Sequence, residues 1–233
     1  KMAGGQDDVD LPDPLIWMAY VASRTTTLKL ATGIVILPQH NPVVIAKQVA
    51  TLDVMSGGRV LFGIGVGWLR EEFEALGVPF AERGARTDEY IAAIRALWTQ
   101  DKPTFKGRFV DFENAYCRPQ PAQGSVPIIV GGQSKAAARR AGRFADGYFP
   151  AREAPAEIIQ YAQAQASAAG RDPATLEITV SMPADPELLN DYAALGVSRV
   201  LVPVTTLTGL DSGIQNPGDV LKWKDTVARF AEL

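Results

Sequence analysis

A glycine pattern at the end of an apolar segment is the feature of this sequence that most directly suggests ligand chemistry. Gly63, Gly65 and Gly67 alternate through the run Arg59-Val-Leu-Phe-Gly-Ile-Gly-Val-Gly-Trp-Leu-Arg-Glu-Glu-Phe73. Glycine removes side chains where a strand ends, and the N–H groups that open a following helix attract a phosphate or carboxylate. Small residues at alternate positions also allow tight packing inside a barrel, so the pattern alone leaves both interpretations open.

A second glycine pair lies in the segment Val130-Gly-Gly-Gln-Ser-Lys-Ala136. Gly131 and Gly132 let a ligand approach the backbone, Ser134 can cap a helix or bond a phosphate oxygen, and Lys135 adds a positive charge. The same residues are also an ordinary way to begin a helix. The segment is therefore a candidate phosphate site with a purely structural alternative.

Other side chains with chemical potential are few. His40 is the only histidine and follows Pro38-Gln39 in an expected loop, where it either faces solvent or contacts a substrate as an acid or base. One histidine without partners does not make a zinc site. Arg139, Arg140 and Arg143 form a basic helix face that we expect to be solvated, although arginine there can also pair with an acidic ligand. The sequence shows no Ser-His-Asp, Cys-His or P-loop arrangement.

Composition excludes several classes of partner. The chain has 233 residues with 23 Lys plus Arg and 26 Asp plus Glu, a net charge of −3, so it offers no basic field for nucleic acid or an anionic membrane. Cys117 is the single cysteine, which excludes an intrachain disulfide and fits a reducing compartment. No apolar run approaches the roughly 18 residues of a membrane span. We therefore expect a cytoplasmic protein that acts on small molecules.

Apolar, β-branched segments alternate with helical patterns along the chain, which predicts an α/β protein with a parallel sheet. The expected strands are Leu28–Leu37, Arg59–Gly67, Val126–Gly132, Asp146–Phe149, Leu176–Met182 and Val197–Val204. The expected helices are Asp13–Thr26, Val43–Met55, Leu69–Leu76, Arg86–Thr99, Ser134–Ala145, Pro155–Ala169, Pro186–Leu195 and Asp219–Ala231. Asn41-Pro42 and Ser56-Gly-Gly58 supply the start and stop signals of the second helix.

One segment, at about residues 103–125, interrupts this alternation. It contains an expected hairpin that turns at Lys106-Gly107, and it is an insertion that forms either a lid or a wall. Six strands are too few for a closed eight-stranded barrel, which would need two more before Leu28. The residues therefore predict either an open sheet or a barrel without its first two βα units.

The long segment from Ala31 to Trp68 resembles the core signature of the luciferase-like monooxygenase superfamily. Within that superfamily, Glu71–Phe80, Val126–Gly132 and Ala145–Tyr148 are similar to the branch that uses the deazaflavin coenzyme F420. The resemblance covers roughly residues 13–204 and weakens after about Ala151. It implies a (β/α)₈ TIM barrel formed by residues 1–233 as a single domain, truncated at its N-terminus, with the insertion before the fifth strand.

The resemblance also implies where the cofactor binds. In relatives the region of Thr32 to Val35 holds a non-prolyl cis peptide bond against the ring, here Thr32–Gly33 or Gly33–Ile34. The cofactor-binding residues implied are Thr32, Gly33, Val35, Gly65, Val66, Gly67, Glu71, Gly131, Gly132, Gln133, Ser134 and Lys135. His40 and Trp68 are expected in the substrate pocket, no metal is expected, and the catalytic residue is not identified, because relatives carry it in the part that precedes this sequence.

Three functions follow from this resemblance. The first is hydride transfer between F420 and a small organic substrate, and Trp68 argues against sugar phosphate oxidation because relatives with that reaction carry glutamate there. The second is an FMN-dependent luciferase-like monooxygenase. The third belongs to another class, a non-catalytic cofactor-binding or partner barrel, since open sheet edges must pair with something. Relatives are often dimers, so a homodimer is also expected.

Overall fold

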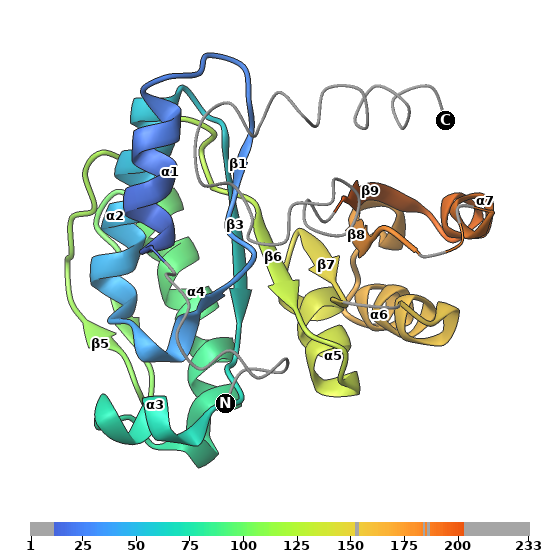
Figure 1. The fold of residues 1–233 in the computed structure, drawn as a ribbon. Coiled ribbons are helices and arrows are strands. Elements are labelled where there is room, and N and C mark those ends of the chain that lie inside the picture. Colours follow the sequence, from blue (N-terminus) through green and yellow to red (C-terminus); the bar gives the residue numbers. More distant parts are fainter. Residues whose placement is uncertain (1–11, 152–153, 184, 186, 203–233) are drawn as a thin grey trace.

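Parallel strands in chain order form one curved sheet in the computed structural model, which describes residues 12–151, 154–183, 185 and 187–202 (Figure 1). The sheet order is β1-β3-β6-β7-β8-β9, with β2 also paired to β3, and each of these ladders is parallel. The strands are β1 (Leu30–Ala31), β2 (Val35–Ile36), β3 (Val60–Gly65), β6 (Ile128–Gly131), β7 (Gly147–Phe149), β8 (Glu177–Ser181) and β9 (Val197–Leu201).

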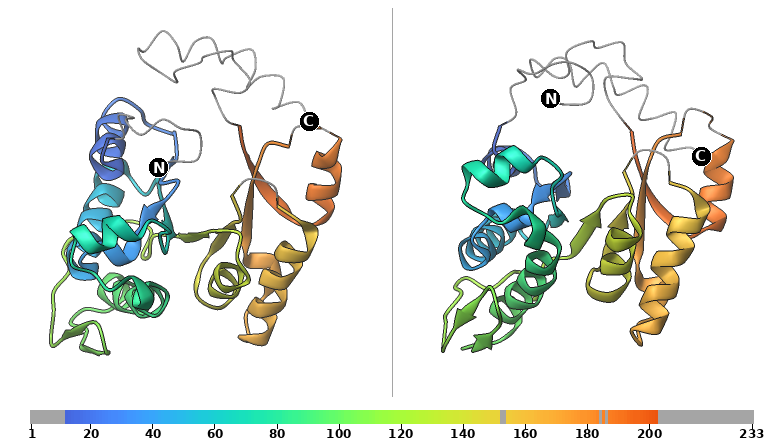
Figure 2. Two further views of the ribbon diagram at one scale, coloured as in Figure 1. Left: turned by 60° about the horizontal axis from the view of Figure 1, so that its bottom comes forward. Right: turned by 90° about the horizontal axis from the view of Figure 1, so that it is seen from below.

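The sheet curls as part of a barrel, with helices α4, α5 and α6 along one of its sides (Figure 2). The helices are α1 (Pro14–Ala22), α2 (Pro42–Ser56), α3 (Arg70–Ala75), α4 (Arg83–Thr99), α5 (Lys135–Phe144), α6 (Ala156–Ala168) and α7 (Leu188–Ala194), with 3₁₀ turns η1 (Leu37–Gln39), η2 (Phe80–Glu82) and η3 (Pro173–Thr175). The alternation expected from the sequence is confirmed. The expected helix Asp219–Ala231 lies outside the described residues.

The expected elements differ from the structure in their exact bounds, and three of the differences are informative. The strand expected at Leu28–Leu37 is two short strands, because a bulge between them interrupts the pairing with β3. Helix α1 ends at Ala22 rather than Thr26, and α4 begins at Arg83 rather than Arg86. The start of α2 is as expected, since the Asn41 side chain accepts hydrogen bonds from the second and third helical N–H groups.

The core between sheet and helices begins on β3. Phe62 packs edge-on against Trp98 of α4, with ring centroids 6.3 Å apart, and both side chains are buried. The Trp98 indole N–H donates to the Ala46 carbonyl of α2 at 2.9 Å. This contact joins one strand and two helices, so the polar edge of the tryptophan is satisfied inside an apolar core.

Arg59, immediately before β3, ties the ends of two helices together. Its Nε donates to the Ser56 carbonyl (2.6 Å), one terminal nitrogen to Thr25 Oγ1 and the Leu28 carbonyl (2.9 and 2.7 Å), and the other to the carbonyls of Ala22 and Thr25 (3.0 and 2.9 Å). These acceptors include the last residues of α1 and α2, where carbonyls have no intrahelical donor. All five donors of the guanidinium are therefore used without an acidic partner.

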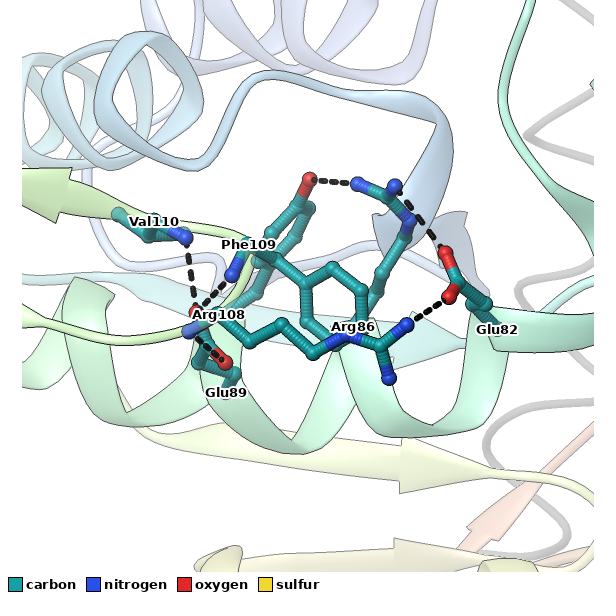
Figure 3. A network of polar contacts seen from close by, with 7 residues as sticks. Glu82, Arg86, Glu89, Arg108, Phe109 and Val110 are labelled. Atoms are coloured by element: carbon teal, nitrogen blue, oxygen red, sulfur yellow. Dashed lines mark hydrogen bonds and ion pairs between the residues drawn. The ribbon is translucent and has the colours of Figure 1, made fainter.

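The turn of the insertion packs against α4, where one carboxylate binds its backbone (Figure 3). Strands β4 (Phe105–Lys106) and β5 (Asp111–Phe112) form the expected antiparallel hairpin. Glu89 of α4 accepts hydrogen bonds from the backbone N–H groups of Arg108, Phe109 and Val110 at 2.9, 2.7 and 2.7 Å. A Cβ on Gly107 would lie 2.2 Å from the same carboxylate, so a larger residue there would displace Glu89 from the turn.

Two arginines complete the attachment of the hairpin. The guanidinium groups of Arg86 and Arg108 lie 4.5 and 4.8 Å from the centroid of the Phe109 ring, and both form ion pairs with Glu82. Such stacked and paired guanidinium groups hold the turn of the hairpin on the first turns of α4. This arrangement favours a fixed wall over a mobile lid.

We predict that Arg59→Lys lowers the free energy of unfolding by about 2–4 kcal/mol, because lysine offers three donors and leaves buried carbonyls unpaired. Urea unfolding followed by circular dichroism measures the loss. Arg24→Lys, at an exposed position in the same loop region, serves as the matched control and should change stability by no more than about 0.5 kcal/mol. Equal effects of the two substitutions would contradict the role of Arg59.

We also predict that Glu89→Ala releases the hairpin, because three backbone N–H groups lose a charged acceptor. Amide hydrogen exchange of residues 107–110 should accelerate at least about tenfold, and stability should fall by about 2 kcal/mol. Glu113→Ala removes only an exposed ion pair with Lys106 in the same hairpin, and it should leave exchange at the turn unchanged. Unchanged protection in Glu89→Ala would show that the hairpin is held by other contacts.

Candidate functional site

The candidate site lies at the carboxyl ends of the parallel strands, near α3 in Figure 1. Strands β2, β3, β6 and β7 run in the same direction, so their carboxyl ends share one edge of the sheet. Most of the residues implied as cofactor-binding follow these strand ends. This edge is the face where barrel enzymes place their chemistry.

A bulge between β1 and β2, the strands at one end of the described sheet, lies beside β3 at this edge. The Gly33–Ile34 peptide bond is cis, which is one of the two bonds at which the resemblance implied it. Thr32 is buried, and its hydroxyl donates to the Gly63 carbonyl at 2.7 Å. The Ile34 side chain lies over the positions of Gly65 and Gly131, where an added Cβ would be 2.3 and 3.0 Å from its atoms.

The bulge changes the explanation of the alternating glycines. The sequence left open whether Gly63 and Gly65 leave room for a ligand or allow tight packing. In the structure, an added Cβ on Gly63 would lie 1.9 Å from the Thr32 carbonyl oxygen, and one on Gly65 would meet Ile34. These two glycines therefore make room for the protein's own bulge. Any ligand at this edge would meet the apolar Ile34 side chain rather than the bare backbone of β3.

Gly67 plays a different part at the end of β3. It has a φ of +78°, a conformation that favours glycine, and its carbonyl accepts a hydrogen bond from Arg83 Nε at 3.2 Å. Val66 is partly exposed beside it. Trp68 follows with 64% of its surface exposed, and Glu71 is exposed on α3. A large exposed aromatic ring and a carboxylate therefore stand at the rim, available to a ligand.

The second glycine segment opens α5. The Ser134 side chain accepts a hydrogen bond from the Ala137 N–H at 3.2 Å, which leaves the N–H groups of Lys135 and Ala136 without an acceptor within the helix. The Lys135 ammonium lies 5.8 Å from the centre of the Tyr161 ring, and its residue is exposed. The Gln133 side chain donates to the Ala151 carbonyl at 2.6 Å. This helix start has the geometry and charge that suit an anion.

His40 lies apart from the glycine segments. It lines a cavity of about 390 Å³ between α1 and α2, together with Val35, Asp13 and other residues of those helices. Desolvation lowers its pKa from the ordinary value of 6.5, although the negative charge of Asp13 acts in the opposite direction. Of the residues implied as cofactor-binding, the cavity includes Val35, whose side chain is 3% exposed. His40 and Val35 thus form a separate group from Ile34, Gly131 and Ser134.

The basic face on α5 is not simply solvated as expected. Arg140 is 4% exposed and pairs through Nε with Asp88 of α4, while its terminal nitrogen donates to the Gly84 carbonyl at 3.1 Å. Arg139 lies 3.8 Å from the same carboxylate. Burial makes the Arg140 pair part of the α4–α5 contact, and only Arg143 of the three is exposed without such a partner among the described ion pairs.

Two contributors to the site were missed in the sequence. Ile34 lies in the middle of an apolar run, and nothing in its type distinguishes it from a core residue. Tyr148 is buried in β7, and its hydroxyl donates to the Gly132 carbonyl at 2.8 Å. A tyrosine inside an otherwise apolar strand is a usable signal, because a buried hydroxyl needs a partner.

Two kinds of feature are not found in the described part of the chain. It contains no group of three or more His, Cys, Asp and Glu side chains arranged to hold a metal ion. Among its helices, none has the length and apolar character that crossing a membrane requires.

A curved parallel sheet with an apolar bulge and an anion-suited helix start at its carboxyl edge defines a barrel-type α/β protein. The family model described as luciferase-like monooxygenase matches residues 2–185, and the chain belongs to this family. An uncharacterized protein of Mycobacterium tuberculosis is 34% identical over 195 residues, which are 81% of this chain and 68% of that protein. The FMNH2-dependent dimethylsulfone monooxygenase of Pseudomonas putida is 41% identical over 133 residues, 55% of this chain and 37% of that enzyme.

Solved structures share the fold. The monooxygenase RslO1 from Streptomyces bottropensis superimposes with a TM-score of 0.66 at 29% identity, covering 79% of this chain and 59% of that one. An F420-dependent secondary alcohol dehydrogenase, in complex with an F420-acetone adduct, superimposes with a TM-score of 0.74 at 20% identity. The match covers 84% of this chain and 80% of that one. The chain thus spans about three fifths of RslO1, and the likeness to the dehydrogenase shows the luciferase-like barrel fold alone.

We predict that the His40 ring titrates below pH 6.5, since desolvation disfavours its charged form. Asp13→Asn should lower the midpoint further, because it removes the charge that raises the pKa while asparagine still caps α1. The folded state favours the neutral ring, so the stability contributed by this group falls as the pH drops below about 6.5.

NMR titration measures this directly, because the chain has one histidine and its ring signals are unambiguous. Asp172→Asn, which keeps a capping side chain at η3, is the matched control and should leave the midpoint unchanged. A midpoint at or above 6.5 in the wild type, or an upward shift in Asp13→Asn, would refute the assignment.

Proposed function

We propose that this protein is an oxidoreductase that transfers a hydride between the deazaflavin coenzyme F420 and a small organic substrate. One observation carries the proposal. The cis bulge at Gly33–Ile34 and the α5 start at Ser134 lie at the same carboxyl edge, in a chain of the luciferase-like family. The similarity of Glu71–Phe80 and Ala145–Tyr148 to the F420 branch supports the choice of coenzyme.

The residues at this edge fit both parts of such a cofactor. Ile34 presents an apolar surface beside Gly131, which suits the face of a planar ring. The N–H groups of Lys135 and Ala136, with the exposed Ser134 side chain, suit a phosphate. In this proposal Thr32, Gly33, Gly65, Val66, Gly67 and Glu71 surround the ring, and Gly131, Gly132, Gln133, Ser134 and Lys135 hold the phosphate.

The bound coenzyme would supply a carbon that donates or accepts the hydride. The protein's contribution is position and exclusion of water: Ile34 supports the ring from one side, and the Trp68 side chain can cover a substrate at the rim. His40 is less suited to proton transfer here, since it lies in the α1–α2 cavity. The catalytic acid or base thus stays unassigned, and the identity of the substrate depends on the rim.

FMN-dependent monooxygenation is the second candidate, and a specific observation favours it. The relative with 41% identity is an FMNH2-dependent monooxygenase, and its matched part is just over half of this chain. FMN ends in one phosphate, which the start of α5 suits equally well. F420 differs in carrying a long polyglutamate tail, which calls for a positively charged groove. The engagement of Arg139 and Arg140 with Asp88 weakens the case for such a groove beside α5.

Further proposals concern the whole protein. The single-domain organisation of residues 1–233 with an insertion at 103–125, a homodimeric assembly and a cytoplasmic location all remain predictions. The third alternative, a barrel that binds a cofactor without turnover, is separated from the first two by a test for redox activity.

We predict that the purified protein binds F420 at least about tenfold more tightly than FMN, a difference of about 1.4 kcal/mol. Fluorescence titration measures both affinities, and an oxygen electrode follows uptake after reduction. The Glu113→Ala variant, changed in the exposed hairpin, is the matched control and should bind like the wild type. Tighter binding of FMN with oxygen uptake would select the monooxygenase, and binding without any turnover of alcohols, aldehydes or sulfones would select the non-catalytic barrel.

A further inference from the structure

Tyr148 contacts the phosphate segment, as we call the candidate phosphate-binding residues Gly131 to Lys135. The resemblance to the family did not imply this contact. The residue is 0% exposed, and its hydroxyl donates to the Gly132 carbonyl at 2.8 Å. The Gly132 N–H in turn donates to the carbonyl of Phe149, the next residue of β7, at 3.0 Å. Two consecutive residues of β7 thus bind both polar backbone groups of Gly132.

The hydrogen bond from the Tyr148 hydroxyl fixes the orientation of a whole peptide group, not only of the Gly132 carbonyl. The peptide bond between Gly132 and Gln133 is trans, so its N–H points opposite to the carbonyl that Tyr148 holds. Gly132 has a φ of +125°, and an added Cβ would lie 3.1 Å from Ala137 Cβ of α5. A glycine in this conformation can rotate to many others, so an external contact is needed to choose one.

The chemistry of the tyrosine suits this task. Burial raises the pKa of its hydroxyl well above the ordinary value, so the group stays protonated and donates throughout the physiological range. A phenylalanine would fill the same space in the core. The hydroxyl therefore has a purpose beyond packing, and its one hydrogen-bond acceptor in the described structure is the carbonyl that directs the chain into α5.

We propose that Tyr148 is a positioning residue: its hydroxyl holds the Gly132–Gln133 peptide so that the start of α5 meets the phosphate group of the cofactor. The inference rests on the proposed function, because it requires that a phosphate-bearing flavin or deazaflavin binds at this edge. It assigns Tyr148 no contact with the reacting atoms.

The test compares ligands with and without phosphate on Tyr148→Phe. FMN is paired with riboflavin, and F420 is paired with its deazaflavin chromophore without the phosphodiester tail. Loss of one hydrogen bond in the supporting loop should weaken FMN and F420 binding about 3–10-fold. Binding of riboflavin and of the tail-less deazaflavin should stay within about twofold of the wild type.

Tyr90→Phe is the matched control. Tyr90 is also buried, at 6% exposure, and its hydroxyl accepts a hydrogen bond from Arg86 at 3.3 Å on α4. Its removal deletes the same chemical group at another place, so the preference for phosphate should be unchanged. Thermal unfolding of both variants separates a loss of stability from a loss of phosphate binding.

Each outcome bears on a different statement. If the wild type binds phosphate-bearing and phosphate-free ligands equally, the proposed phosphate site is wrong. If the wild type prefers phosphate and Tyr148→Phe keeps that preference, or weakens both ligand types equally, the role of Tyr148 is overturned. If Tyr148→Phe does not fold, site-specific replacement of Tyr148 by 4-fluorophenylalanine fills the space of the hydroxyl without a donor, and an unchanged phosphate preference then overturns the proposal.

Discussion

The packing of the Ile34 side chain over Gly65 and Gly131 is the contact on which the arrangement of the site depends. Pairing with β3 would otherwise be continuous from β1 to β2, and the bulge interrupts it at one end of the described sheet. The neighbouring strands accept the bulge because they carry glycine at the two positions that it covers. Hydrogen bonding of Thr32 to Gly63 then fixes the bulge from the side of β3. The proposed platform for a ring therefore depends on residues from three segments of the sheet, the β1–β2 bulge, β3 and β6.

The proposed phosphate end of the site, Gly131 to Lys135, depends on a different pair of strands. Strand β6 leads into Gly132, and β7 holds that residue through Tyr148 and the Phe149 carbonyl. The bulge and the phosphate segment share Gly131, which packs against Ile34 and precedes Gly132. A displacement of β6 relative to β3 would therefore move the bulge contact and the phosphate segment together. The pairing of β3 with β6 thus sets the distance between the proposed ring platform and the proposed phosphate site.

The sequence predicted those features that local residue types determine. Asn41-Pro42 and Ser134 mark helix starts because their side chains bond nearby N–H groups, and the hairpin turn at Gly107 follows from a local pattern. Features that depend on contacts distant in the chain were missed or misread. The role of Gly65 depends on Ile34, which only the folded structure brings to it, and the burial of Arg140 depends on Asp88 of another helix. Residue type alone does not encode such partners.

The charges around α5 bear directly on the choice of cofactor. A net positive face of three arginines would suit a long acidic tail, but Asp88 neutralises Arg140 and lies near Arg139. The groups of α5 that stay available to an anion are then the Lys135 side chain and the backbone N–H groups of the first turn. One phosphate is satisfied by such a set, whereas the further carboxylates of a polyglutamate tail must find cations elsewhere on the rim or remain in solvent. Affinity for F420 above that for FMN therefore requires a contribution from the ring or from a part of the rim other than α5.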